Sequence, residues 1–383
     1  MIDRIASTRR SRACALTLAL ITVWAGSAVT AVAEPSHAES PLRYGLVFSR
    51  FLPGADVGEA YRVSAGGTAE HSIDPVYDAA ILSHDGTRLA DVVPTPDGQL
   101  ATAIFDVNGS GYHLLPAADS TLQLGYPTWS ADDSRIASQG WDFSDASRAG
   151  IYSRRSSDGG GLRRLTASGT RADYPITPGG FTHDGSRLLF FRPDAKNETS
   201  DSAPQDLFVV GAGGGAVTRL TPPGTTSAVV FSFDSVSWSP DGERVAVVAA
   251  NGPFWKNTNR SVYLASPDGR GFRPIGPQGD IWDAVWSPDG RWIAFTMATK
   301  VTGGLHELYL MHPDGSHLQA LTSASGGQFS LQPVWAPDSS QLLFIRGAHD
   351  VHQVDLWSIN VDGSHLYQAT HDPAEYRGVA WLP

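Results

Sequence analysis

Three histidines in the C-terminal part of the chain have the side chains of a metal site. His349 and His352 stand in the segment His-Asp-Val-His, and His306 directly precedes Glu307. Neutral imidazoles with a carboxylate suit zinc, manganese or a similar divalent ion. His-x-x-His is also a common chance spacing outside helices, so solvated loop residues are the simpler interpretation. We therefore expect no cofactor, with a divalent metal held by these three histidines as the alternative.

Four aromatic side chains occupy comparable polar segments and are candidates for ligand binding. Exposed rings of this kind stack on sugars or anchor a protein partner. The alternative is that they cap the hydrophobic edge between neighbouring units of the fold. The four residues are Trp141, Phe254, Trp255 and Trp282.

An internal repeat supplies the elements that must position these residues. Its clearest copy reads VWSPDGRWIAF at 285–295 and HELYLMHPDGSHLQALT at 306–322. Pro-Asp-Gly predicts a tight turn, because Pro fixes the first φ, Asp bonds the local backbone and Gly takes a left-handed conformation. Each copy therefore predicts four short strands, a to d, with tight turns from a to b and from c to d.

The repeat can be counted by the large residue that closes strand a, by the strand-c aromatic and by the turn after strand c. All three reach seven, but the first copy lacks strand a and the last strand a has nothing after it. We expect these fragments to complete one blade, with residues 43–51 as its strand b. The prediction is an all-β propeller of seven four-stranded blades, with six or eight blades as alternatives. The residues that close strand a are Leu82, Trp129, Phe181, Trp238, Trp286, Trp335 and Trp381.

The pattern WSPDG, RIAF, LYLM, DG and LT, in that order, resembles the WD40-like repeats of the TolB type, also called PD40 repeats. The resemblance covers nearly all of the chain after residue 43 and implies a propeller. TolB itself adds a smaller N-terminal α/β domain, for which residues 34–42 leave no room, so the resemblance is to the repeats. Oligogalacturonate lyases, which have related repeats, place metal-binding histidines on the propeller, and this resemblance implies the metal alternative.

The first 33 residues differ from the rest. Four arginines precede an apolar run that ends in Ala-Val-Ala at 31–33. This pattern predicts a cleaved secretory signal, followed by a linker at 34–42 and a single propeller at 43–383. The protein would then be extracytoplasmic, either periplasmic or secreted, with no membrane span after cleavage. An uncleaved N-terminal membrane anchor is the alternative.

The net charge and the absence of several motifs exclude some classes of function. The net charge is −11, and loss of residues 1–33 would make it more negative, so nucleic acid is a poor partner. Cys14 is the only cysteine and lies inside the expected signal, which leaves no disulfide or thiolate site. The chain has no nucleophile elbow, phosphate-binding loop or dinucleotide fingerprint.

The loops of such a propeller divide into two sets. The b–c and d–a loops share one face of the disc and carry the variation in length, and binding residues concentrate on variable loops held by a rigid scaffold. We expect a monomeric, exported scaffold that binds a protein or glycan of the cell envelope or exterior through this face. The alternative is a carbohydrate-active enzyme, a metal-assisted lyase or hydrolase. Non-enzymatic binding is favoured, and no catalytic residue can be assigned.

Overall fold

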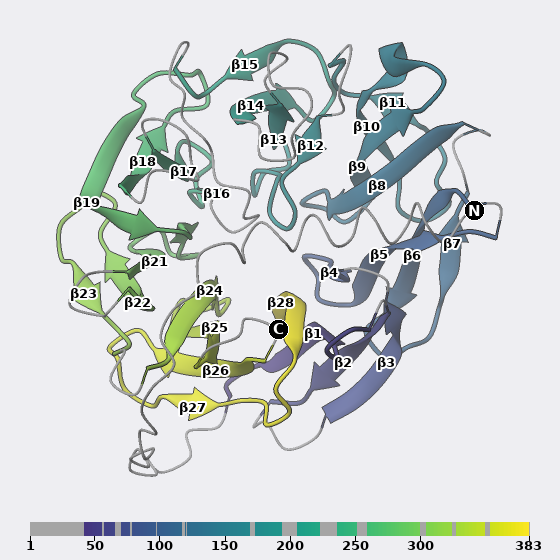
Figure 1. Ribbon diagram of the computed structural model, residues 1–383. Helices are drawn as coiled ribbons and strands as arrows, with labels where there is room; N and C mark the ends of the chain where they lie inside the picture. The colour runs from purple at the N-terminus through teal and green to yellow at the C-terminus, as the bar shows by residue number, and fades with distance from the viewer. Residues whose placement is uncertain are drawn as a thin grey trace.

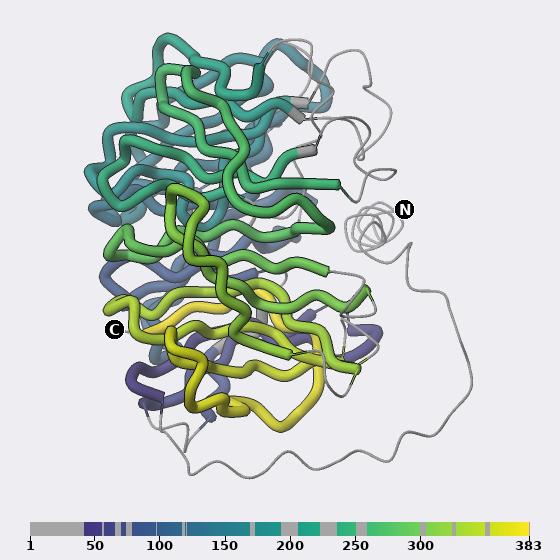
Figure 2. Tube along the Cα trace, turned by 90° about the vertical axis from the view of Figure 1, so that its left-hand side faces the viewer, coloured from purple at the N-terminus to yellow at the C-terminus, as the bar shows by residue number. Residues whose placement is uncertain are grey.

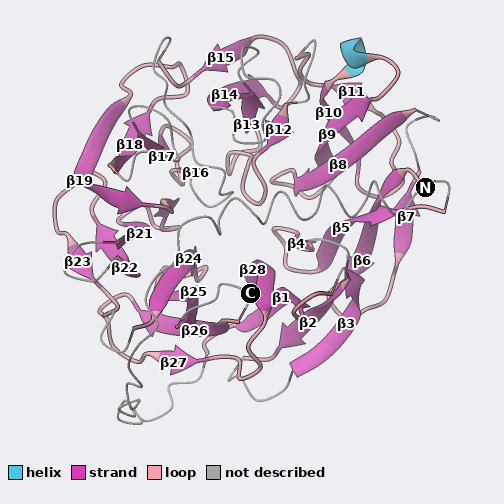
Figure 3. Cartoon of the chain, viewed as in Figure 1, coloured by secondary structure: helices cyan, strands magenta, loops and turns pink. Residues whose placement is uncertain are grey.

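The chain folds as a disc of antiparallel sheets arranged around a central axis, as seen in a computed structural model (Figure 1). Apart from one 3-10 helix, Ala146–Arg148, the regular elements of the described residues are all strands (Figure 3). No helix in this part of the chain is both long and apolar enough to cross a membrane. The expected signal lies outside the described residues. These are 42–55, 57–65, 70–76, 79–96, 98–116, 119, 121–168, 173–193, 205–222, 236–250, 259–298, 304–323, 327–348 and 353–382.

Five sheets have four strands each. From the axis outward, the first is β28 (Glu375–Leu382), β1 (Gly45–Phe51), β2 (Gly58–Val63) and β3 (Glu70–Val76). The next two are β4 (Ile81–Leu82), β5 (Arg88–Pro94), β6 (Leu100–Asp106) and β7 (His113–Leu115), and β8 (Leu122–Trp129), β9 (Arg135–Asp142), β10 (Gly150–Arg155) and β11 (Arg163–Arg164). The last two are β12 (Tyr174–Pro175), β13 (Arg187–Pro193), β14 (Gln205–Gly211) and β15 (Val217–Arg219), and β24 (Phe329–Trp335), β25 (Gln341–Gly347), β26 (Asp355–Asn360) and β27 (Tyr367–Gln368).

A sixth sheet has eight strands and contains two copies of the repeat. The copies are joined because the end of β19 pairs with β21, matching Asp280 with Ala298 and Ile281 with Met297. The predicted all-β propeller with four-stranded blades is therefore confirmed. The strands of this sheet are β16 (Val236–Trp238), β17 (Val245–Ala250), β18 (Arg260–Ala265), β19 (Arg273–Ile281), β20 (Val285–Trp286), β21 (Ile293–Ala298), β22 (His306–Met311) and β23 (Gln319–Ala320).

The two ends of the described chain meet in one sheet. β28 pairs antiparallel with β1, from Gly45 opposite Leu382 to Phe51 opposite Glu375. Figure 1 shows this as the yellow last strand lying beside the purple first strand. The pairing completes one blade from the two ends of the repeat, as expected. In this blade β28 is strand a and β1 is strand b.

The tryptophans that close strand a pack between neighbouring blades, which explains why the repeat keeps them. Four of the five donate the indole N–H to the backbone carbonyl just before the marker of the preceding blade, at 2.9–3.0 Å. Trp286 is also buried, but its Nε1 has no hydrogen-bond partner among the described residues. The four donor–acceptor pairs are Trp129 with Ile81, Trp238 with Gly180, Trp335 with Val285, and Trp381 with Val334.

The Pro-Asp-Gly-type turns are held by their own side chains. In the turn after β4, Ser83 Oγ donates to Asp85 at 2.7 Å and accepts from the N–H of Arg88 at 3.0 Å. Serines or threonines with aspartates form the same contacts in the turns that begin at Ser130, Thr182, Ser239 and Ser287. The aspartates are thus turn residues, as their spacing predicts.

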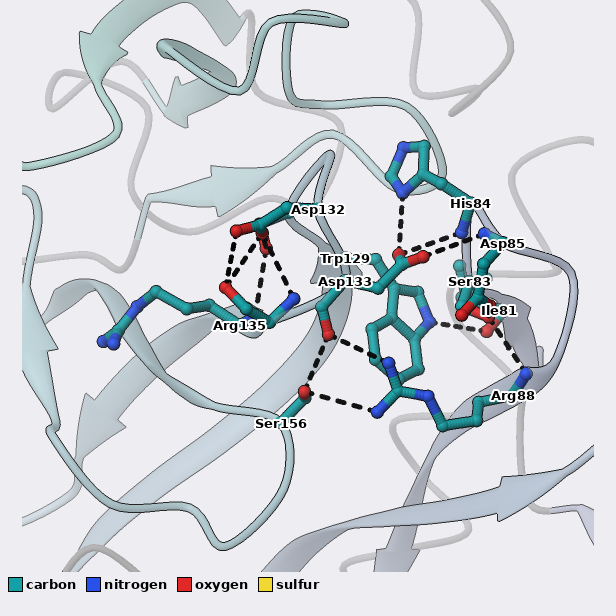
Figure 4. A network of polar contacts seen from close by, with 12 residues as sticks. Ile81, Ser83, His84, Asp85, Arg88, Trp129, Asp132, Asp133, Arg135 and Ser156 are labelled. Atoms are coloured by element: carbon teal, nitrogen blue, oxygen red, sulfur yellow. Dashed lines mark hydrogen bonds and ion pairs between the residues drawn. The ribbon is translucent and has the colours of Figure 1, made fainter.

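Two of these turns replace the glycine by a residue that links blades. Asp133 has a φ of 54°, and its carboxylate accepts the backbone N–H groups of His84 and Asp85 in the preceding blade (Figure 4). Ser339 has a φ of 61° and accepts the N–H of Asp289 in the same way. Both side chains therefore use the left-handed position to bind one turn to the next.

Candidate functional site

Strand direction places the connections on two sides of the disc, which Figure 2 shows on edge. We call the side that carries the a–b and c–d turns the turn face. The side that carries the b–c and d–a connections is the loop face. The turn face is the more uniform of the two, because its residues serve the repeated turn contacts.

Four of the seven ligand candidates from the sequence cannot be placed: His349, His352, Phe254 and Trp255 lie outside the described residues. The residues that are described contain no group of three or more His, Cys, Asp or Glu side chains that could hold a metal ion. The alternative of a metal site formed by the three histidines therefore stays a prediction. The structure does place Trp141, Trp282 and His306.

Trp282 and His306 come together on the loop face, in the eight-stranded sheet. Their rings are 5.0 Å apart and meet edge to face. Asp280, at the end of β19, accepts the indole N–H of Trp282 at 2.9 Å and the guanidinium of Arg260 at 2.6 Å. The guanidinium carbon of Arg260 lies 5.5 Å from the centre of the Trp282 ring. We call these four residues the His306 cluster.

Burial controls the charges of this cluster. The side chain of His306 is 12% exposed, and burial lowers the pKa of its imidazole to about 4, against the opposing effect of the Asp280 carboxylate. Its Nε2 is 4.0 Å from Asp280 Oδ2 and has no hydrogen-bond partner among the described residues. Burial also lowers the pKa of Arg260, to about 10, so Arg260 stays cationic at neutral pH. The cluster thus combines an ion pair, a neutral imidazole and an indole.

The next residue along β22, Glu307, has a structural role. Thr322 donates its hydroxyl to Glu307 at 2.5 Å and accepts the N–H of Leu308 at 2.9 Å. Thr370 makes the corresponding contacts with Asp355 and with the N–H of Leu356. The threonine at the end of each of these two repeats is therefore a clamp that ties the segment after the fourth strand of a blade to its third strand.

Trp141 lies at the end of β9, against the neighbouring strand β8. It is half-buried, and a Cβ at Gly125 would come within 3.0 Å of its indole, so glycine makes room for the ring. This contact fits the interpretation that Trp141 covers an edge of the fold. The more exposed ring is Phe143, which is 72% exposed and meets Trp141 edge to face at 6.5 Å.

Sequence reasoning missed Arg260, Asp280 and Phe143. Arg260 and Asp280 are 20 positions apart and meet only because β18 and β19 pair, which leaves no local pattern to find. Phe143 follows Trp141 in a segment already singled out for its aromatic content. The aromatic composition of that loop was the one feature of the sequence that could have pointed to Phe143.

A cavity of about 310 Å³ lies on the turn face, beside the turns that begin at Ser130 and Thr182. Its polar side chains already serve the fold. Asp132 accepts from Ser130 and Ser134, and Arg135 donates to Ser153 (the Asp132 and Arg135 side chains are drawn in Figure 4). We therefore place the candidate site on the loop face.

Comparison with curated proteins finds relatives over parts of the chain, and no family model matches. The Tol-Pal system protein TolB of Anaeromyxobacter dehalogenans (strain 2CP-C) is 32% identical over 101 residues, which are 26% of this chain and 21% of TolB. The uncharacterized peptidase YuxL of Bacillus subtilis (strain 168) is 26% identical over 155 residues, 40% of this chain and 22% of YuxL. The chain thus matches about a fifth of the length of these relatives.

Solved structures share the fold. TolB from Acinetobacter baumannii has a TM-score of 0.50 at 16% identity and covers 88% of this chain and 81% of its own. The propeller domain of the trilobed protease from Pyrococcus furiosus has a TM-score of 0.58 at 12% identity. The match covers 87% of this chain and 97% of the propeller domain. An oligogalacturonate lyase in complex with manganese has a TM-score of 0.57 at 14% identity and covers 86% of each chain. At these identities the likeness concerns the fold alone. The chain resembles TolB-like propeller proteins in its repeats, and the resemblance is to the repeats rather than to full-length TolB.

Proposed function

We propose that the chain is an exported propeller that binds a protein or glycan of the cell envelope or exterior through its loop face. We propose further that the ring has seven blades, and the eight-stranded sheet supports this count because it contains two copies of the repeat joined where β19 pairs with β21. Export rests on the N-terminal signal pattern of residues 1–33. A ring of this kind presents many connections on one face, which suits recognition of an extended partner.

The His306 cluster is the observation that carries this proposal. It places a half-buried indole, a cationic guanidinium, a carboxylate and a neutral imidazole side by side on the loop face. Aromatic and arginine side chains dominate the binding energy of protein interfaces. Indoles also stack on the apolar faces of sugars.

A matched pair of tryptophans provides the test. Trp282 lies 5.0 Å from His306 on the loop face, and Trp292 lies 4.4 Å from His312 on the turn face. Both indoles are half-buried. Immobilised wild-type protein is incubated with fractionated cell envelopes and a glycan array. We expect Trp282→Ala to lose at least tenfold in affinity for the partner found, and Trp292→Ala to bind as the wild type does.

Two outcomes would count against the binding proposal. One is that the wild type captures nothing from any fraction or array while it degrades a polysaccharide. The other is that Trp282→Ala and Trp292→Ala weaken capture equally, which would indicate a general loss of structure.

A second candidate function is a metal-assisted lyase or hydrolase acting on a carbohydrate. His306 favours it, because its imidazole is neutral and its Nε2 has no hydrogen-bond partner among the described residues. His349 and His352 would supply the other ligands. Metal analysis of the purified protein checks this directly. Absence of a stoichiometric divalent ion, together with unchanged behaviour of the His306→Ala, His349→Ala and His352→Ala variants, would remove it.

A further inference from the structure

Three innermost strands share a backbone irregularity at the same place in the repeat. The residue three positions before the strand-a marker has a left-handed backbone in each: Tyr126 with a φ of 50°, Gln332 with 55° and Gly378 with 57°. The pairing of β8 with β9 and of β24 with β25 shifts register at this place, as in a β-bulge. The bulge therefore recurs in three of the blades.

Glycine is the residue that adopts this conformation without steric cost. At Gly378 it is required, because a Cβ there would collide with the carbonyl oxygen of Ala80. No such restriction excludes a side chain at position 126, where the chain carries a tyrosine. A bulky residue with positive φ is a backbone outlier, and outliers of this kind concentrate at functional sites.

Contacts on both sides of position 126 help to hold this bulge. Thr177 donates its hydroxyl to the carbonyl of Pro127 at 2.7 Å, which fixes the backbone immediately after the bulge. On the other side, Gly125 lies under the indole of Trp141. A glycine at position 126 would therefore keep the backbone path and remove the strain.

The Tyr126 side chain lies on the innermost strand of its blade, and 37% of the residue is exposed. It meets Tyr174 of β12 at 6.1 Å with an interplanar angle of 60°. β8 and β12 are the innermost strands of neighbouring blades (Figure 1). The two tyrosines thus form an aromatic pair beside the axis of the ring.

In the other blades, the described residues three positions before the strand-a marker carry no exposed charge. Asp283 is the only ionisable one among them, and it is 2% exposed and accepts from the Thr296 hydroxyl and from the N–H of Gln332. The other described positions are Ala79, Pro178, Gln332 and Gly378. The pair therefore suits an uncharged occupant.

We propose that Tyr126 and Tyr174 form a subsite for the end of a neutral glycan chain. The apolar face of a pyranose stacks on an aromatic ring such as that of Tyr126, and its hydroxyls can bind the phenol group of Tyr174. The proposal rests on the proposed binding function and specifies its ligand class. It also explains why a strained tyrosine stands where a glycine would fit.

The test measures binding of two neutral tetrasaccharides, chitotetraose and cellotetraose, by calorimetry and saturation-transfer NMR. We expect the wild type and Tyr126→Phe to bind at least one of them with similar affinity. Tyr126→Gly should bind at least tenfold more weakly and have an equal or higher melting temperature. The control Tyr112→Ala removes a tyrosine that is 49% exposed at the outer edge of the ring, and it should bind as the wild type does.

Three results would overturn the subsite. They are no binding of either tetrasaccharide by the wild type, unchanged binding by Tyr126→Gly, or a lower melting temperature of Tyr126→Gly that accounts for its loss of binding. Capture of an envelope protein that depends on Trp282, without tetrasaccharide binding, would reject this subsite and leave the binding function standing. Tetrasaccharide binding that depends on Tyr126 but not on Trp282 would support the subsite and reject the His306 cluster as the carrier of recognition.

Discussion

His306 is a buried histidine that folds in its neutral form. Its pKa is about 4 in the folded protein, below the ordinary value of 6.5. Between these values the unfolded chain binds a proton that the folded chain does not, so the contribution of His306 to stability is complete above about pH 6.5. It is lost progressively as the pH falls towards 4.

We therefore expect His306→Gln to flatten the pH dependence of stability. Urea unfolding of both proteins at several pH values between 4 and 7 measures this. The free energy of unfolding of the wild type should fall more steeply with decreasing pH than that of the variant. Parallel curves would show that His306 is protonated as readily in the folded protein as in the unfolded chain.

Trp381 joins the last strand to the blade before it. It is 4% exposed, and its indole N–H donates to Val334 at 3.0 Å. We expect Trp381→Ala to lower the free energy of unfolding by about 3–5 kcal/mol, as for other large buried aromatic residues. Trp381→Phe keeps most of the packing and loses the hydrogen bond, with an expected cost that includes about 1 kcal/mol for that bond. Equal urea midpoints for the wild type and Trp381→Ala would contradict the inferred role.

At the scale of the strands, the threonine clamps compensate for very short outer strands. β23 and β27 have two residues each, so backbone pairing alone holds them weakly. Thr322 adds a hydroxyl that bonds both the N–H of Leu308 and one oxygen, Oε2, of the buried Glu307 carboxylate. The clamp places one side chain at the junction of two strands.

Thr322→Val keeps the shape of this side chain and removes its hydroxyl. A buried N–H and a buried carboxylate then lose a partner, and we expect a cost of about 1–3 kcal/mol in the free energy of unfolding. Thr322→Ser, which retains the hydroxyl, is the control and should cost less. A valine variant as stable as the serine variant would indicate that packing rather than hydrogen bonding keeps threonine there.

The repeat explains how far sequence reasoning reached. Turn residues such as Asp85 and markers such as Trp129 act locally or once per blade, so their spacing predicted the strands, the turns and the joining of the first and last strands. Asp133 links two blades through a position where the repeat predicts glycine, so the pattern gives no signal of this contact. The His306 cluster depends on cross-strand register, which one sequence does not encode in a local pattern.

For the whole molecule, β28 decides whether the first blade is complete. Truncation after Ala374 would expose the edge of β1 and the buried surface that Trp381 covers. We expect the truncated protein to aggregate, because an unpaired strand edge pairs with other copies. Light scattering and size-exclusion chromatography measure this. A synthetic peptide of residues 375–382 should restore a soluble monomer, and a scrambled peptide should not, whereas a truncated protein that stays monomeric alone would show that β28 is dispensable.

The pairing of β28 with β1 also determines how the ring responds to force. Gly45 lies opposite Leu382, so the first strand begins where the last strand ends. A pull on both ends of the propeller would load the hydrogen bonds of this pair one at a time, as in opening a zipper, instead of shearing them together. We therefore expect the first blade to open at a lower force than the other blades. A protein tethered at one end and loaded at the other would then lengthen without unfolding the rest of the ring.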